Sequence, residues 1–230
     1  MTANYNIYTF IHKYLRQQLC QSVINIGCLD DSDDGEVRNC LYQVSTQLDF
    51  CQSHLDNENR FIHTAIQARN PNMYLTTEAE HREHEVTIRK LKKDIQSILE
   101  SSGARRSALL HTLYLELSLF LAENLEHMHT EETHNARLLS DLFTQTEIDH
   151  IHENIVASIS PERRLRITGD MLCALMHTER LSLLLEMQQH MPEPVFMKLI
   201  VQLNSILSAA HFGKLQQGLG HLLIGESQIA

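Results

Sequence analysis

Glycine and proline are scarce in this sequence, with 8 and 4 occurrences among 230 residues. Because these residues mark turns and strand ends, their scarcity excludes a loop-rich chain of many short elements. Apolar residues recur with helical rather than alternating periodicity over long windows, so we expect an all-α protein without strands. No apolar stretch approaches the length of a membrane span and no apolar signal segment opens the chain, so we expect no membrane partner.

Basic residues are also few: 19 Lys and Arg stand against 29 Asp and Glu, a formal net charge of -10. This charge argues against nucleic acid as a partner, because neutralising phosphates requires clustered basic side chains. The 5 cysteines form no C-x-x-C pair and are odd in number, and Cys51 is expected to be a small apolar filler. Such cysteines are typical of reduced thiols, so we expect a cytoplasmic protein without a zinc finger or ribbon.

The helical periodicity predicts four long helices, at about residues 4–26, 36–69, 77–100 and 104–142. Four long helices with short connections favour an up-down-up-down four-helix bundle, which we assign to residues 1–145. The T-E-A-E segment that starts at Thr77 has the form of a capping box, and it is expected to begin the third helix.

Residues 146–230 are predicted to form a C-terminal helical extension packed on the bundle, because Leu and Met recur there at core spacing. Thr146 is expected to cap one short helix, and Ser160 another helix that runs to about His190. One more helix is expected to follow, and the tail after Ala210 is weakly patterned.

The residue present in excess is histidine, which occurs 15 times. Each predicted bundle helix places at least one histidine in the row of side chains that faces the core. The rows consist of Tyr8, His12, Leu15 and Leu19 in the first helix; Cys51, His54, Glu58, Phe61 and Ala65 in the second; His81, His84, Ile88 and Leu91 in the third; and Phe120, Asn124, His127, Glu131, His134 and Leu138 in the fourth. A buried carboxylate is very costly unless it is paired or bound to a metal, so these rows need a partner.

These polar side chains also agree in their position along the bundle axis. Neighbouring helices of an antiparallel bundle run in opposite directions, so the position is counted from the N-terminus in one helix and from the C-terminus in the next. Counted in this way, the side chains all lie toward one end of the interior. The candidate metal ligands are His12, His54, Glu58, His81, His127 and Glu131. Four imidazoles and two carboxylates without a thiolate suit iron, manganese or zinc, and two carboxylates able to bridge favour a pair of ions.

Other polar residues lie near this set. His84 and Glu85 are compatible both with extra ligands and with a supporting position beside the ligands. Glu132 is expected in solvent or in such a supporting position. Most other histidines, His63 and His221 among them, are expected to be ordinary core or boundary residues.

The order of these residues resembles the hemerythrin-like, or HHE cation-binding, family of di-iron four-helix proteins. The resemblance covers about residues 4–142 and lies in His12, the Glu80-His81 pair and two H-x-x-x-E motifs. It implies that Glu58 and Glu131 bridge two irons. The terminal ligands that it implies are His12, His54, His81 and His127.

The chain departs from the oxygen-carrying hemerythrins in two places. Their third helix supplies two histidines four residues apart, whereas Glu85 stands four residues after His81 in this sequence. Their fourth helix takes a five-residue step to an aspartate, whereas Glu131 follows His127 by four residues. These departures argue against stable reversible O2 carriage and favour the broader HHE group, which is implicated in sensing O2 or NO and in handling iron.

The leading prediction is therefore a hemerythrin-like protein whose carboxylate-bridged di-iron centre binds O2 or NO or handles iron. Two alternatives stay open: a di-iron oxidase, peroxidase or NO-reducing enzyme, and a helical interaction module in which the metal is structural. The sequence reveals no output domain, so any sensing would pass to a partner protein, with the C-terminal extension as the candidate surface. Catalytic residues and the oligomeric state are left open.

Overall fold

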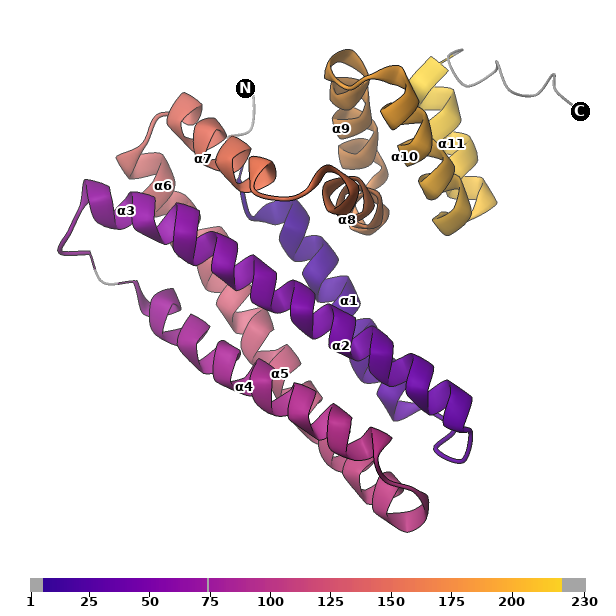
Figure 1. The fold of residues 1–230 in the computed structure, drawn as a ribbon. Coiled ribbons are helices and arrows are strands. Elements are labelled where there is room, and N and C mark those ends of the chain that lie inside the picture. The colour runs from indigo at the N-terminus through magenta and orange to yellow at the C-terminus, as the bar shows by residue number, and fades with distance from the viewer. Residues whose placement is uncertain (1–5, 74, 221–230) are drawn as a thin grey trace, which may run out of the picture. The chain divides into compact units, whose positions relative to one another are not determined.

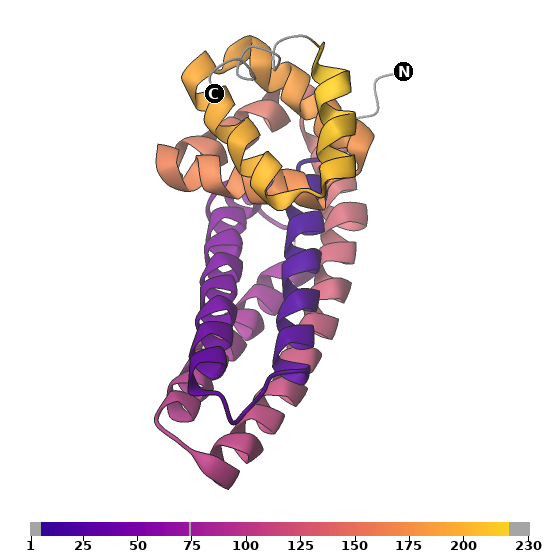
Figure 2. The same ribbon diagram turned by 90° about the vertical axis from the view of Figure 1, so that its right-hand side faces the viewer.

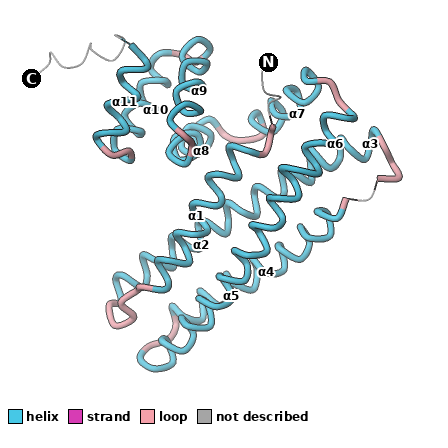
Figure 3. Tube along the Cα trace, turned by 180° about the vertical axis from the view of Figure 1, so that it is seen from behind, coloured by secondary structure: helices cyan, strands magenta, loops and turns pink. Residues whose placement is uncertain are grey.

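The computed structural model describes residues 6–73 and 75–220, and within these residues it contains helices and no strand (Figure 1, Figure 3). The prediction of an all-α protein is thus confirmed for this part of the chain. The helical elements are α1 (Thr9–Gly27), α2 (Asp34–Asn57), η1 (Glu58–His63), α3 (Thr64–Arg69), α4 (Thr76–Leu99), α5 (Gly103–Thr130), η2 (Glu131–Asn135), α6 (Ala136–Leu142), α7 (Gln145–Ala157), α8 (Pro161–Ala174), α9 (His177–His190), α10 (Glu193–Ile206) and α11 (Ala209–Leu219).

Four long helices lie side by side, as two perpendicular views show (Figure 1, Figure 2). Helix α1 contacts α2 and α5, and α4 contacts the same two helices, so each long helix has two neighbours among the other three. Helix α2 continues through η1 into α3, and α5 continues through η2 into α6, without leaving the helical path. Side chains on all four long helices therefore meet in one interior.

Two apolar clusters fill this interior. One cluster runs through Leu15 to Ile26 of α1 and includes Leu55, Ile88 and Met128. The other contains Ile7, Tyr8, Ile62, Ile66, Leu75, Leu139 and Ile148. Along every long helix, the buried histidines and glutamates come between residues of the first cluster and residues of the second. A polar layer consequently divides the core.

The helices that carry the two H-x-x-x-E motifs both turn π-helical at the glutamate, over Glu58–His63 and Glu131–Asn135. A π turn holds one residue more than an α turn, so the inward row moves by one position. The predicted row Phe61 and Ala65 was therefore wrong, and Ile62 and Ile66 are buried in its place.

The same shift corrects the end of the fourth helix. The inward row was predicted to continue at His134 and Leu138, yet His134 is exposed. Asn135 and Leu139 are the buried residues, because η2 adds one residue to the turn that follows Glu131.

Two predicted helix starts also differ from the structure. Helix α4 begins at Thr76 with Leu75 as its N-cap, and no side chain caps it. Thr77 was expected to form the capping box, but it is fully buried and its hydroxyl turns to the interior. Helix α1 begins at Thr9, and the predicted start near residue 4 lies outside the described residues.

The caps of the later helices need correction too. Thr144 rather than Thr146 caps α7, because Thr144 and Glu147 form a reciprocal capping box. The helix expected to run to His190 is broken between α8 and α9, where the buried Arg180 guanidinium donates hydrogen bonds to the carbonyls of Leu172 and Leu175. The tail expected to be weakly patterned forms α11 as far as Leu219.

The chain divides into two compact units, Met1–Ser158 and Ile159–Ala230. Helix α7 belongs to the first unit, where it contacts η1 and places Ile148 in the second apolar cluster. The second unit comprises α8 to α11 and has its own buried side chains, among them Leu172, Leu184, Leu199, Leu203 and Leu215. None of the helices in the described part of the chain is long and apolar enough to cross a membrane.

Candidate metal centre

The structure brings the six predicted ligands together in two groups that could each hold a metal ion. One group consists of His12, His54, Glu58 and Glu131, and the other of Glu58, His81, His127 and Glu131. Within each group, one nitrogen or oxygen atom per residue lies within 4.8 Å of the others. The two groups share both glutamates, so the same two carboxylates belong to both candidate positions for a metal ion.

Each group contains one close pair of imidazoles. The Nε2 atoms of His12 and His54 lie 3.2 Å apart, and those of His81 and His127 lie 3.0 Å apart. These nitrogens come from all four long helices, α1 and α2 in the first pair and α4 and α5 in the second. Two nitrogens that face each other this closely require a proton or a cation between them.

The two carboxylates extend from one pair of imidazoles to the other. Glu58 places Oε1 3.2 Å from His54 Nε2 and Oε2 3.6 Å from His81 Nε2. Glu131 places Oε2 3.4 Å from His12 Nε2 and Oε1 3.5 Å from His81 Nε2. Each carboxylate can therefore offer one oxygen to each of two ions, as a bridging ligand does.

The carboxylate oxygens lack other partners. Glu58 and Glu131 are 3 % and 0 % exposed, and none of their four carboxylate oxygens has a hydrogen-bond partner within the described part of the chain. Buried polar atoms are nearly always hydrogen-bonded, and a buried ionised carboxylate is retained only where a charge compensates it. Four such oxygens beside four imidazoles therefore fit a site for cations.

The electrostatics keep both carboxylates ionised. Burial raises the pKa of the Glu131 carboxyl, but the neighbouring imidazoles of His127, His81 and His12 together lower it by more, so that it lies well below its usual value. The pKa of Glu58 is lowered as well, since its neighbouring imidazoles outweigh burial and the repulsion from Glu131. Burial lowers the pKa of His127, yet the carboxylates of Glu131, Glu80 and Glu58 together raise it to about 10. A proton on His127 thus occupies the place that a cation could take.

Three of the four imidazoles are oriented by a second hydrogen bond at Nδ1. His12 contacts Glu132 Oε1 at 3.1 Å, His81 contacts Asn59 Oδ1 at 2.8 Å and His127 contacts Glu80 Oε2 at 2.7 Å. When Nδ1 donates to an oxygen, Nε2 is left as the atom that can bind a metal. Glu132 thus orients a candidate ligand, His12, which is one of the two roles that the sequence left open for it. Arg16 Nη1 in turn donates a hydrogen bond to Glu132 Oε1 at 2.6 Å.

We expect Glu80→Gln to weaken metal binding by about 10-fold to 100-fold, because substitutions in the groups that orient ligating histidines have effects of this size. The amide cannot accept from His127 Nδ1 as strongly as a carboxylate does. Metal affinity measured by competition with a chelator tests this expectation. Glu78→Gln is the matched control, since Glu78 lies on the same helix and pairs with the exposed Arg82. Equal losses in the two variants would contradict the assignment.

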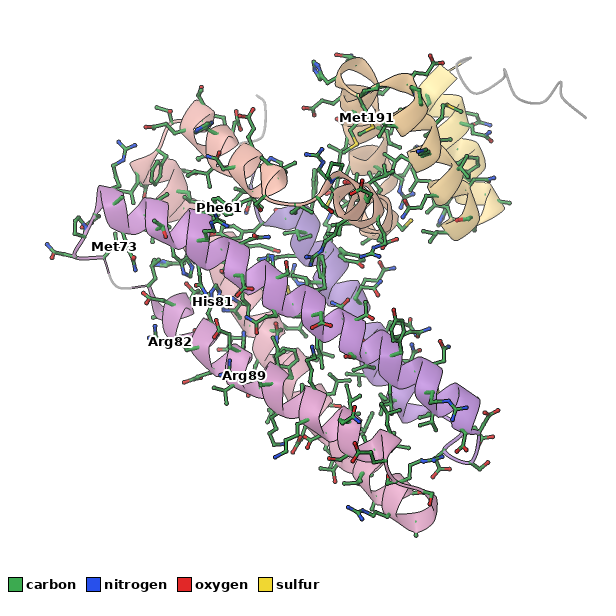
Figure 4. The ribbon with its side chains drawn as sticks, in the orientation of Figure 1. Phe61, Met73, His81, Arg82, Arg89 and Met191 are labelled. Carbon is green, nitrogen blue, oxygen red and sulfur yellow. The ribbon has the colours of Figure 1, made fainter. Side chains whose placement is uncertain are left out.

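The two additional candidates take different positions. His84 is buried and its ring contacts those of Phe120 and His127, but it belongs to neither group. Glu85 belongs to neither group either, is partly exposed, and pairs with Arg89 at 3.8 Å. Figure 4 shows the same division on α4, where His81 lies in the interior and Arg89 on the outside.

One further histidine lies near the centre. His63 was expected to be a core or boundary residue, and it is indeed buried; its ring stacks on that of His81, with centroids 4.8 Å apart. A small cavity of about 150 Å³ is lined by Asn59, His63, Gln67, Glu78 and Arg82. Two of these lining residues, Asn59 and His63, contact His81, so the cavity reaches the surroundings of the centre. His221, the other residue named with His63, lies outside the described residues.

The thiols near the core are expected to be unreactive. Burial raises the pKa of Cys51 to about 12 and that of Cys40 to about 11, whereas Cys20 and Cys28 are exposed. Since the thiolate is the reactive form, a thiol reagent at about pH 8 should modify Cys20 and Cys28 rapidly and leave Cys51 unmodified until the protein unfolds. Mass spectrometry of the labelled peptides measures this. Fast labelling of Cys51 in the folded protein would disagree with its burial.

Comparison with known proteins adds no family to this description. No family model matches the chain, and no curated protein is significantly similar to it. The fold and the site therefore define a class: an all-helical protein whose buried His and Glu groups could hold metal ions.

Proposed function

We propose that the protein is a hemerythrin-like protein, in which an up-down-up-down four-helix bundle holds a carboxylate-bridged di-iron centre that binds O2 or NO. The observation that supports this most directly is the sharing of Glu58 and Glu131 by two His pairs. Their four oxygens, which have no hydrogen-bond partner among the described residues, fit bridging between two cations. We further propose that the protein works in the cytoplasm.

Iron is the metal that this donor set favours in our proposal. Each ion would receive two imidazole nitrogens and one oxygen from each shared carboxylate. Four protein donors per ion would also satisfy zinc, so we choose iron because it takes further ligands in addition to these four, as the binding of O2 or NO requires. Magnesium and calcium prefer all-oxygen sites, and the set contains no thiolate for copper(I). Manganese is the second choice, and zinc could occupy the same atoms.

The residues around the centre would control access to it. Iron supplies redox chemistry and affinity for diatomic ligands. Apolar side chains on both sides of the polar layer, such as Met128 and Ile62, exclude water. The open pocket beside Asn59 and His63, of about 150 Å³, has room for a diatomic molecule. These features are compatible with the binding of a small ligand.

Anaerobic loading with Fe(II) followed by admission of air tests the proposal. We expect about two irons per chain by metal analysis, and a ligand-to-metal absorption band in the near-ultraviolet or visible range after air is admitted. A His111→Ala variant serves as control, because His111 is an exposed histidine of α5 outside both groups. Less than one iron per chain, or no absorption change, would overturn the proposal. Sustained consumption of peroxide or NO in the presence of a reductant would favour the alternative function, a di-iron peroxidase or NO-reducing enzyme.

A further inference from the structure

A second buried polar layer lies one helical turn from the ligands. Each of the four long helical segments contributes one residue to it, namely Tyr8, His63, Thr77 and Asn135. Their exposed fractions are 1 %, 2 %, 0 % and 0 %. Four polar side chains at one level of a core are costly unless hydrogen bonds or a ligand satisfy them, so this layer requires an account.

Three members of this layer form a connected chain. Asn135 Nδ2 donates to Thr77 Oγ1 at 3.1 Å, and Thr77 Oγ1 lies 3.4 Å from His63 Nε2. The His63 ring in turn stacks on that of the candidate ligand His81. These contacts satisfy the Thr77 hydroxyl and orient the His63 ring against the centre.

Tyr8 is different. Its hydroxyl is buried and has no hydrogen-bond partner among residues 6–73 and 75–220. Its ring lies 5.4 Å from that of His12, which is one helical turn further along α1. Burial raises the pKa of the hydroxyl, as do the nearby carboxylates of Glu131 and Glu58. This buried donor beside His12 therefore has no acceptor within the described part of the chain.

The carboxylate oxygens are poor candidates for that acceptor, because the proposed ions require them. The Asn135 side chain lies near the Tyr8 hydroxyl and lowers its pKa as a hydrogen-bond donor does, and Asn135 Oδ1 has no partner within the described part of the chain. A ligand that supplies an acceptor atom would provide the hydrogen bond that the Tyr8 hydroxyl lacks. A small anion, or a diatomic molecule that gains negative charge on binding, is the ligand class that such a neutral donor stabilises.

We infer that the Tyr8 hydroxyl donates a hydrogen bond to a small anionic ligand bound at the dinuclear centre, on the side of the second polar layer. This inference rests on the proposed metal site and goes beyond it, because it names the face on which the ligand binds and a residue that selects the ligand. Tyr8 is a specificity-determining residue in this account and takes no part in holding the metal.

The test uses the full chain loaded with iron, and azide as the probe. We expect Tyr8→Phe to raise the azide Kd roughly 10-fold to 100-fold, as for loss of a hydrogen bond to a charged group. The infrared stretch of bound azide should shift between H2O and D2O in the native protein but not in Tyr8→Phe. Tyr14→Phe is the matched control, because it removes the same hydroxyl from α1 where Tyr14 packs on Phe50.

Each outcome decides the question. An unchanged azide Kd in Tyr8→Phe, with normal iron content, would overturn the inference and assign Tyr8 to Asn135 or to a carboxylate. If Tyr8→Phe does not fold, the D2O measurement on the native protein still decides, since the absence of any shift contradicts the hydrogen bond. Failure of the native protein to bind iron would refute the proposed function, which is a different result.

Discussion

Replacing Glu131 with alanine is expected to lower the metal content from about two ions per chain to well below one, whereas replacing His54 with alanine should remove about one ion. The difference follows from membership of the two groups. Glu131 belongs to both groups, but His54 belongs only to the group that contains His12. A bridging residue therefore contributes to the binding of both ions, whereas a terminal residue contributes to the binding of one.

Charge strengthens this expectation. In dinuclear sites the two ions lie roughly 3.5 to 4 Å apart, where two divalent cations repel each other strongly unless anionic ligands lie between them. Glu58 and Glu131 are the carboxylates common to both groups. Without Glu131, a single negative charge would be left between the cations. An ion bound at one position would then weaken the binding of an ion at the other position.

Metal analysis after equilibrium dialysis measures the two stoichiometries. Glu131→Gln keeps the volume of the side chain and removes its charge, so it separates electrostatic from packing effects. Glu123→Ala is the control on the same helix, because Glu123 is exposed and belongs to neither group. If Glu131→Ala and His54→Ala lose the same amount of metal, the two groups do not share a bridge.

Much of this site could be predicted from helical spacing. One histidine in the inward row of each long helix, and a glutamate four residues after two of them, identified the six residues that the structure brings together. The spacing sufficed because the ligands come from helices that remain regular up to His54 and His127. Periodicity places side chains correctly as long as the helix keeps its period.

The π turns could not be predicted in the same way. A π turn is intrinsically less favourable than an α turn, and tertiary contacts decide where one forms. Here the extra residue lets Glu58 face the centre while its neighbour Asn59 accepts a hydrogen bond from His81. Consecutive residues of an α-helix point about 100° apart, and the sequence alone offered no reason to place both of these side chains inside.

The third helix illustrates a second limit of local patterns. T-E-A-E matched a capping box, but Thr77 enters the second polar layer and Glu80 orients His127. Both residues have partners that are distant along the chain, and the contact to His127 spans 47 residues. Local capping chemistry and tertiary partners compete for the same side chains, and here the buried partners prevail.

Removing the metal is expected to lower the melting temperature substantially. A ligand present at about 1,000 times its Kd stabilises the folded state by about 4 kcal/mol. With a shift of roughly 2 to 4 °C per kcal/mol for chains of this size, one ion alone corresponds to roughly 8 to 16 °C. The six candidate ligands all lie in Met1–Ser158, so the melting transition of that unit should shift to lower temperature when the metal is removed. Calorimetry of chelated and reloaded protein measures the shift.

A double variant, Glu58→Leu with Glu131→Leu, should remove the dependence of stability on metal. Metal-free native protein buries both carboxylates, whose oxygens have no hydrogen-bond partner among the described residues. Replacing buried charged groups with apolar ones of similar volume is often stabilising by about 1 to 4 kcal/mol, so the variant should melt above the metal-free native protein and be insensitive to chelator. If it melts lower and native protein ignores the chelator, protein contacts alone stabilise the carboxylates.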